Sequence, residues 1–328
     1  MKIAVYKDNL STGRGADRAV RNFAAGLAER GHSVALFERA ELPTRLAEHW
    51  DVIVATGSNE IVDLDSAGYF ERSSRAKVVL QLHVAPRGFF KWRHPLRNWR
   101  IRKAFDRADA VQVLCGSYVD EFRRIAPHPR VTVIGNYTEI ASSGGSRPES
   151  IILYPAAAIN RTKNQKLLIE AFALLVDEFP AWKVRLLGKD STAYAEQCRK
   201  IIARKGLAER IELVGFTNDL PGEYSRAAFV AFPSVLEGFP LAVLEAARFS
   251  LPIVAQSGLP GIDDIVTADT GVVTGPTVAE YAVGLRSLMT DADLRSRLGS
   301  GACARCASRY GREKILDQWE ALLESVVK

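Results

Sequence analysis

The sequence predicts an α/β fold with two domains, each built around a parallel β-sheet. Short apolar runs of strand length alternate with amphipathic helical patterns, an order typical of parallel sheets covered by helices on both faces. The chain has 328 residues, enough for two domains of ordinary size, and 47% of them are hydrophobic. In such sheets we expect ligand-binding residues at the carboxyl ends of the strands.

The first half of the chain, residues 1–141, is predicted to form the first domain. Its predicted strands are Lys2–Tyr6, Ser33–Phe37, Asp51–Ala55, Lys77–Leu82, Ala110–Leu114 and Val131–Ile134. Helical patterns between them cover residues 16–30, ended by Gly31, residues 96–107 and residues 118–125.

A loop with Gly13 and Gly15 joins the first strand to the first helix. Strand, glycine loop and helix together form a layout that binds phosphate at the helix N-terminus. The third glycine and the acidic residue of a dinucleotide fingerprint are not in register. From the residues alone, a phosphate-binding loop and a flexible turn are equally good interpretations.

His83 stands at the end of the fourth predicted strand, where ligand-binding residues are expected. A lone histidine at such a place is more often a structural group than a site residue. The residues alone therefore leave its role open.

The stretch Arg87–Lys103 contains seven Lys or Arg and no acid, and it also contains Phe and Trp. The net charge is +6, so the rest of the chain is neutral to within one charge. The stretch has three interpretations: a loop for an anionic or lipid-linked acceptor, a patch for an anionic membrane surface, or a solvated helix face. One short patch is thin evidence for nucleic acid, which is not expected as a partner.

Residues 142–150 are rich in Ser and Gly and are predicted to link the two domains. The second domain is predicted over residues 151–310. Its predicted strands cover residues 151–154, 183–187, 211–214, 229–232, 252–255 and 271–273. Residues 311–328 carry apolar side chains at helical spacing and are predicted to form a final helix.

Lys163 lies where the first helix of the second domain is predicted to begin. A lysine at this end opposes the helix dipole unless an anion lies between them. The position therefore favours a phosphate, with a tolerated surface lysine as the alternative.

The segment from Phe229 to Arg248 reads as strand, loop and helix, with Glu237 in the loop and Glu245 within the helix. Pro240 fits the first helical position, which leaves the N–H groups of Leu241 and Ala242 free at a positive helix end. The turn at Gly238 is thus a place for a phosphate, flanked by two carboxylates that suit the hydroxyls of a sugar.

The motif Pro-Ser-x-x-Glu-Gly-Phe-Pro-Leu-x-x-x-Glu over residues 233–245 resembles the Glu-x7-Glu signature of retaining glycosyltransferases of family 4. The resemblance implies the glycosyltransferase-B (GT-B) fold, in which two Rossmann-like domains face a cleft. It implies that the first domain binds the acceptor and the second binds a nucleotide sugar. In this fold the final helix commonly crosses back to the first domain.

The resemblance also implies roles for individual residues. Catalytic roles fall on His83, Lys163 and Glu237. The implied donor-binding residues are Gly13, Gly15, Lys163, Gly238, Phe239, Pro240, Leu241 and Glu245. Glu237 would hold a donor-sugar hydroxyl and Glu245 the ribose hydroxyls. The family has an arginine where this chain has Ala158, and we expect Arg161 to replace it.

The implied reaction transfers a sugar from a nucleotide diphosphate to an acceptor hydroxyl with retention of configuration. No cofactor and no metal are expected, since an Asp-x-Asp site is not evident. Cys303 and Cys306 form a lone CxxC without further ligands. The rival interpretations are a catalytically silent sugar-nucleotide-binding protein and an NAD-dependent oxidoreductase. The sequence leaves the base, the sugar and the acceptor open, whether polysaccharide, glycolipid or small molecule.

No apolar run is long enough for a membrane helix, and the N-terminus lacks a secretory signal pattern. We therefore expect a cytoplasmic protein, with peripheral binding at the inner face of the membrane as the open alternative.

Overall fold

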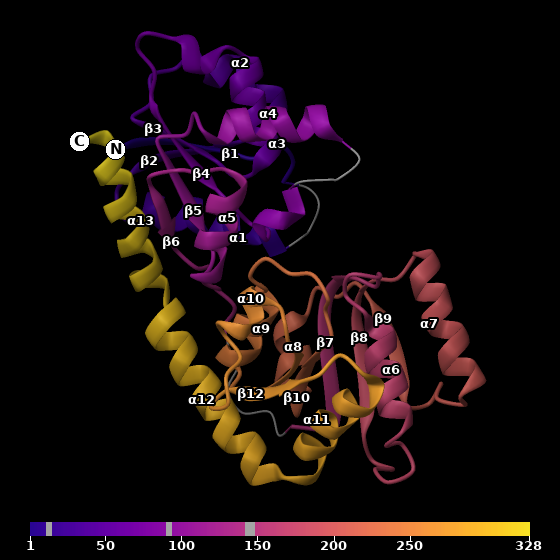
Figure 1. Cartoon of the computed structure of the whole chain (residues 1–328). Coiled ribbons are helices and arrows are strands. Elements are labelled where there is room, and N and C mark those ends of the chain that lie inside the picture. The colour runs from indigo at the N-terminus through magenta and orange to yellow at the C-terminus, as the bar shows by residue number, and fades with distance from the viewer. Residues whose placement is uncertain (11–14, 90–93, 142–147) are drawn as a thin grey trace. The chain divides into compact units, whose positions relative to one another are not determined.

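The computed structural model describes residues 1–10, 15–89, 94–141 and 148–328, apart from the side chains of Arg87 and Phe89. The chain divides into two compact units, shown in Figure 1. Unit 1 comprises Met1–Thr138 and Tyr310–Lys328, and unit 2 comprises Glu139–Arg309. Most of the predicted linker, residues 142–147, lies outside the described residues.

Within the described ranges, unit 1 contains a parallel sheet of six strands in the order β2-β1-β3-β4-β5-β6. The strands are β1 Lys2–Tyr6, β2 Ser33–Phe37, β3 Val52–Ala55, β4 Lys77–Gln81, β5 Ala110–Val113 and β6 Val131–Val133. The strand order reverses at β1 and β3, which pair directly. Sheets of this kind bind ligands beyond the carboxyl ends of the strands at such a reversal.

The helices of unit 1 pack on its sheet. They are α1 Gly15–Glu29, α2 Leu42–Arg45, α3 Ser58–Ser66, α4 Pro95–Phe105, α5 Ser117–Ile125 and α13 Arg312–Val327, with short 3-10 turns η1 Arg39–Glu41, η2 Tyr69–Glu71 and η3 Pro86–Phe89. The prediction of a final helix is matched by α13. The predicted helix over residues 96–107 begins at Pro95, where the missing N–H is tolerated, and ends at Phe105.

Helix α13 packs against α1 in unit 1. The rings of Phe23 and Trp319 lie 4.5 Å apart between centroids, and Trp319 is buried. Gly26 allows this approach, because a Cβ there would lie 2.9 Å from Leu316. At the edge of the contact, the Arg30 guanidinium contacts three acids of α13. They are Glu313, Asp317 and Glu320.

Unit 2 contains, among the residues described, a second parallel sheet of six strands in the order β12-β11-β10-β7-β8-β9. The strands are β7 Ile151–Ala158, β8 Lys183–Lys189, β9 Ile211–Gly215, β10 Phe229–Phe232, β11 Ile253–Gln256 and β12 Gly271–Thr274. Here the strand order reverses at β7 and β10. The helices are α6 Gln165–Ala173, α7 Ala193–Arg204, α8 Leu220–Arg226, α9 Leu241–Arg248, α10 Pro260–Asp263, α11 Val278–Thr290 and α12 Ala292–Tyr310.

Strand β7 is longer than its sequence pattern predicts. It continues through Pro155 to Ala158 with a shift in register against β8. The shift accommodates a close approach of β8, where Gly188 has φ +117° and a Cβ would lie 2.4 Å from the carbonyl oxygen of Ala156. A proline-containing extension of this kind has no simple periodicity, which is why the pattern missed it.

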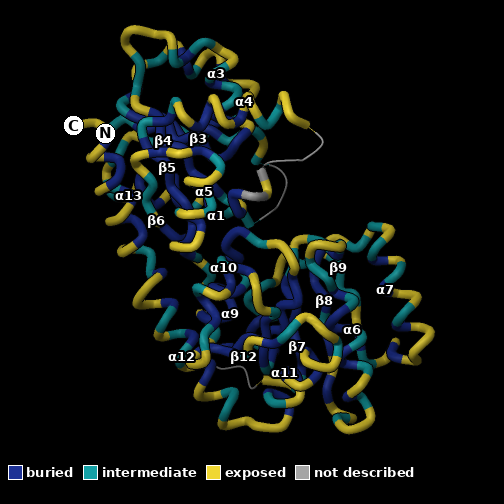
Figure 2. Tube along the Cα trace, viewed as in Figure 1, coloured by how far each residue is buried: buried dark blue, intermediate teal, exposed yellow. Residues whose placement is uncertain are grey.

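The core of each unit lies along its sheet, as the buried strands in Figure 2 show. The four residues of β3, β5 and β10 are all buried, as expected for parallel strands covered on both faces. Among the helices in the described ranges, none combines the length and apolarity needed to span a bilayer.

Candidate functional site

Lys163 and Glu237 meet at the strand reversal of unit 2. Lys163 follows β7 and precedes α6, while Glu237 lies in the loop between β10 and α9. The Lys163 ammonium donates a hydrogen bond of 2.5 Å to Oε1 of Glu237. The Glu237 side chain is 9% exposed and that of Lys163 is 23% exposed. The structure thus brings together the predicted phosphate ligand and the predicted sugar ligand.

The two loops that carry this ion pair are tied to each other. The backbone N–H of Val235 donates to the carbonyl oxygen of Thr162 at 2.9 Å. The Tyr154 hydroxyl donates to the carbonyl oxygen of Lys163 at 2.9 Å and lies 2.7 Å from Oγ of Ser234. Burial, and then the negative charge of Glu237, raise the pKa of Tyr154, so the phenol stays protonated. These bonds set the spacing of the two loops.

The loop before α6 is also organised by its own side chains. The Oδ1 atom of Asn160 accepts hydrogen bonds from the N–H groups of Thr162 and Lys163, at 3.0 and 3.2 Å. The buried Gln165 side chain donates to the carbonyl oxygen of Ala158 at 3.2 Å. The Arg161 side chain is exposed. Burial raises the pKa of Tyr194, and the positive charge of Arg161 lowers it in part. Arg161 therefore lies on the same turn as Lys163.

Glu245 is held inside unit 2 by a tyrosine. Its carboxylate accepts a hydrogen bond of 2.8 Å from the hydroxyl of Tyr224, and the residue is 2% exposed. The Tyr224 ring stacks on Phe249 with centroids 5.2 Å apart. Tyr224 was not predicted as a site residue. The available signal was its position in α8, the helix that precedes the motif with Glu237 and Glu245.

The start of α9 differs by one residue from the prediction. Pro240 is the residue before the helix, with φ −75° and ψ 114°, and Leu241 is the first helical residue. The carbonyl oxygen of Pro240 still accepts from the N–H of Val243 at 3.1 Å. The amides of Leu241 and Ala242 remain in the first turn, where an α-helix offers no internal acceptor. Gly238 and Phe239, the other predicted residues of this turn, are buried.

In unit 1, His83 follows β4 at the carboxyl edge of the sheet. Both ring nitrogens are buried and have no hydrogen-bond partner within the described ranges. Burial, helped by the positive charge of Lys7, lowers the pKa of His83 to about 3. The imidazole is therefore neutral at physiological pH. Gly15 is the first residue of α1, whereas Gly13 lies outside the described residues.

Sequence reasoning missed a charged cluster at the strand reversal of unit 1. The Lys7 ammonium, just after β1, lies 2.5 Å from Oε1 of Glu60 on α3 and also contacts Asp8. Glu60 is 2% exposed, and burial raises the pKa of its carboxyl. The available signal was the position of these residues directly after β1 and β3, the strands that meet at the reversal.

Residues that could hold a metal are not clustered in the described part of the chain. No group of three or more His, Cys, Asp or Glu converges there. The thiol of Cys306 is buried, and this burial raises its pKa to about 11. Cys303 and Cys306 are both free thiols.

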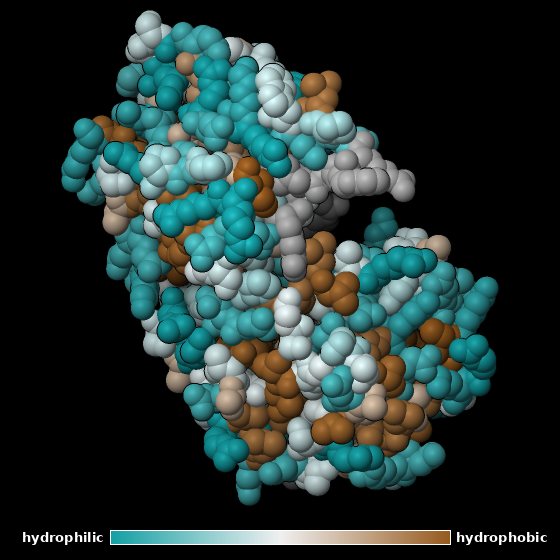
Figure 3. Space-filling view, viewed as in Figure 1, coloured by the Kyte–Doolittle hydropathy of each residue, from teal (hydrophilic) through white to brown (hydrophobic). Residues whose placement is uncertain are grey.

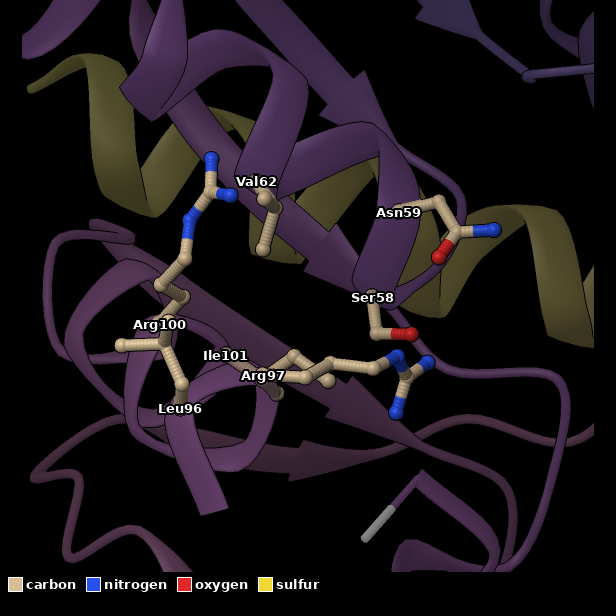
Figure 4. A pocket seen from close by; sticks show the side chains of 7 residues that line it. All are labelled: Ser58, Asn59, Val62, Leu96, Arg97, Arg100 and Ile101. Atoms are coloured by element: carbon tan, nitrogen blue, oxygen red, sulfur yellow. The ribbon is translucent and has the colours of Figure 1, made fainter. Parts of the chain in front are cut away.

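Two pockets in the described ranges lie away from the Lys163–Glu237 pair. One, of about 210 Å³, lies between α3 and α4 in unit 1 (Figure 4). The other, of about 370 Å³, lies at the amino ends of β7, β8 and β9, at the edge opposite to Glu237. Arg185 and Arg226 in its lining already contact carboxylates. Neither pocket coincides with the predicted donor site.

Comparison with protein families gives a match over about half of this chain. The family model described as "Glycosyl transferases group 1" matches residues 136–305, about half of the chain. This range contains Lys163, Glu237 and Glu245.

Individual relatives are distant and longer. An uncharacterised glycosyltransferase of Haemophilus influenzae is 27% identical over 158 residues, which are 48% of this chain and 44% of that protein. The D-inositol 3-phosphate glycosyltransferase of Streptomyces bingchenggensis is 34% identical over 52% of this chain and 39% of that protein. The alpha-D-kanosaminyltransferase of Streptomyces kanamyceticus is 26% identical over 71% of this chain and 64% of that protein. The chain spans less than two thirds of each of these relatives.

Solved structures match over the whole chain. Anabaena HepE in complex with UDP has a TM-score of 0.83 and 20% identity, covering 99% of this chain and all of that one. Sucrose-phosphate synthase of Thermosynechococcus elongatus has a TM-score of 0.82 and 16% identity, covering 99% of both. At these identities the likeness concerns the fold. It confirms the predicted α/β fold with two Rossmann-like parallel sheets of the GT-B class.

Proposed function

The chain belongs to the family of glycosyl transferases group 1, and from this premise we propose that it is a retaining, metal-independent glycosyltransferase. It moves a sugar, of the hexosyl type, from a nucleotide diphosphate donor to an acceptor hydroxyl. The observation that carries the proposal is the pairing of Lys163 with Glu237 at the strand reversal of unit 2.

Donor binding exchanges the partners of this ion pair. The diphosphate takes the ammonium of Lys163, and hydroxyls of the donor sugar donate to the carboxylate of Glu237. Each ionic group keeps a partner in the exchange, because diphosphate oxygens replace the carboxylate at the lysine and sugar hydroxyls replace the ammonium at the carboxylate. The amides of Leu241 and Ala242, at the positive end of α9, are further donors to the diphosphate.

In the reaction, the bond between the anomeric carbon and the diphosphate oxygen breaks while the acceptor oxygen bonds to the same face of the sugar. The acceptor hydroxyl gives up its proton to the departing diphosphate oxygen. Positive charge develops on the sugar ring and negative charge on the departing diphosphate. Lys163 and Arg161 stabilise the leaving group. Glu237 holds the sugar, Glu245 the ribose hydroxyls, and neutral His83 of unit 1 contacts the sugar.

UDP is the proposed nucleotide, since the structurally similar Anabaena HepE was solved with UDP. The proposed acceptor is a glycan or glycolipid of cell-envelope polysaccharide synthesis, or a small glycoconjugate. Unit 1 is proposed to bind this acceptor. We assign the protein to the cytoplasm.

Peripheral binding to an anionic membrane surface through Arg87–Lys103 belongs to the same proposal. Exposed Leu96 and Trp99 on α4 lie beside the basic residues Arg100 and Arg102. In Figure 3 the surface of unit 1 on the visible side is mostly hydrophilic, which suits electrostatic rather than deep apolar attachment. Residues 90–93 of the stretch, including Lys91 and Arg93, lie outside the described residues.

A catalytically silent sugar-nucleotide-binding protein is the second candidate, favoured by Ala158 at the position of the family's arginine. The glycosyltransferase should hydrolyse the donor slowly without acceptor, whereas a catalytically silent protein should not. The test is a UDP-sugar transfer assay in the presence of EDTA, with the anomeric configuration of the product determined by NMR. Retained configuration with EDTA present supports the proposal. Inversion, or activity only with added divalent metal, contradicts it.

A further inference from the structure

The pocket of about 210 Å³ in unit 1 lies between α3 and α4, and its lining is basic. Its lining contains two arginines and no acid. The lining residues are Ser58, Asn59, Val62, Leu96, Arg97, Arg100 and Ile101. A water molecule occupies about 30 Å³ in the liquid, so the volume admits a phosphate together with part of the group that carries it.

Ser58 is the first residue of α3 and points into this pocket. The residue is only 8% exposed, and its hydroxyl has no hydrogen-bond partner among the described residues. Figure 4 shows this hydroxyl turned toward the guanidinium of Arg97, which comes from α4. Helix α3 has nine residues and begins after Gly57 without a side-chain cap. The hydroxyl and the first-turn amides therefore offer donors to an anion here.

The acids near the start of α3 do not line the pocket. Glu60 and Asp8 contact the ammonium of Lys7, and Asp8 also accepts a 3.1 Å hydrogen bond from the side-chain amide of Asn59. Arg100 donates to the Ser66 hydroxyl at 2.9 Å, a neutral partner that leaves its positive charge in place. The lining itself thus carries two guanidinium groups and no carboxylate.

The apolar part of the lining is formed by Val62, Leu96 and Ile101, and Leu96 is 71% exposed. A ligand seated here meets donors at one end and carbon surface beside them. This combination suits a phosphate ester better than a free ion.

We propose that this pocket binds the phosphate group of the acceptor substrate through Ser58, Arg97 and the first turn of α3. That the phosphate belongs to an acceptor rests on the proposed function, whereas the binding of a phosphate ester does not. The same chemistry is offered by a soluble polyol or sugar phosphate and by a phospholipid headgroup.

The test measures binding of glycerol 1-phosphate by calorimetry and of vesicles containing phosphatidic acid by co-sedimentation. All proteins carry Lys163→Ala, so that the proposed donor site does not contribute. On this background Arg97→Ala and Ser58→Ala are compared with Arg102→Ala, a matched change on the same helix outside the pocket lining. Arg97→Ala should weaken binding about 10-fold or more, the loss of one charge-assisted hydrogen bond. Ser58→Ala should weaken it several-fold and Arg102→Ala by less than about 2-fold.

A soluble source is supported if Arg97→Ala weakens binding of glycerol 1-phosphate and Arg102→Ala does not. A lipid source is supported if this difference between the two variants appears with the vesicles alone. Equal effects of Arg97→Ala and Arg102→Ala, or no binding of either probe, overturn the proposal. UDP binding of the single variant Arg97→Ala, measured separately, should equal that of the unchanged protein. Failure of the unchanged protein to bind UDP would contradict the proposed function and leave this pocket assignment standing.

Discussion

The ammonium of Lys163 lies 2.5 Å from the carboxylate of Glu237, although the two residues are 74 positions apart in the chain. Strands β7 and β10 pair directly, and the residues that follow their carboxyl ends are thereby brought together. The proposed diphosphate ligand and the proposed sugar ligand thus neutralise each other in this ion pair. This pairing explains how two ionic groups can lie in a largely buried turn.

Glu237→Gln separates the two roles of the pair. The variant frees Lys163 from its ion pair, so binding of UDP alone should be unchanged or tighter. Transfer should slow about 10- to 100-fold, because a hydrogen bond to a charged group contributes about 1.5–3 kcal/mol. Calorimetry with UDP and a turnover assay with UDP-sugar check the two parts. An unchanged kcat would contradict the role given to Glu237.

Tyr154→Phe tests the link between the two loops. The change removes the hydrogen bonds to the Lys163 carbonyl and to Ser234, and leaves buried acceptors unpaired. We expect a loss of about 1–3 kcal/mol in the free energy of unfolding and weaker UDP binding. Tyr281→Phe is the control, since Tyr281 bonds to the carbonyl oxygen of Val254 in the same unit. It should lower stability and leave UDP affinity unchanged; equal effects on affinity would argue against a positioning role for Tyr154.

His83 should make the stability of the protein fall at acidic pH. Its folded-state pKa of about 3 lies below the usual value of 6.5, so the unfolded chain binds the proton first. Stability is therefore full above about pH 6.5 and falls as the pH drops toward about 3, with at most about 1.4 kcal/mol lost per pH unit. Urea unfolding of the unchanged protein and of His83→Gln between about pH 4 and 7 measures the difference. Parallel curves would show that His83 titrates normally in the folded protein.

Trp319→Ala tests the packing of α13 on α1. Trp319 is buried against Phe23, so its truncation should cost about 3–5 kcal/mol of stability in unit 1. The matched control is Trp99→Ala, because Trp99 is 59% exposed and should cost little. Comparable losses in thermal unfolding for the two variants would rule out the structural role assigned to Trp319.

Much of the fold was predictable because buried parallel strands are short continuous apolar runs, as in β3, β5 and β10. The motif around Glu237 was predictable because its loop and helix are contiguous in sequence. The contacts of Lys7 with Glu60, and of Tyr224 with Glu245, were not. They join residues 53 and 21 positions apart that meet only after the sheets form and the helices pack. The predicted start of α9 was one residue too early. Pro240 has ψ 114°, which places it before the helix, and residue type alone does not set this angle.

The most direct test of the central claim is calorimetric titration of UDP, GDP, ADP, CMP and NAD, without added metal, into the unchanged protein and Lys163→Ala. Lys200→Ala, an exposed lysine of the same unit, is the charge control. The account predicts that UDP binds, that Lys163→Ala weakens this binding at least about 10-fold, and that Lys200→Ala does not. Binding of NAD alone, or of no nucleotide, would contradict it.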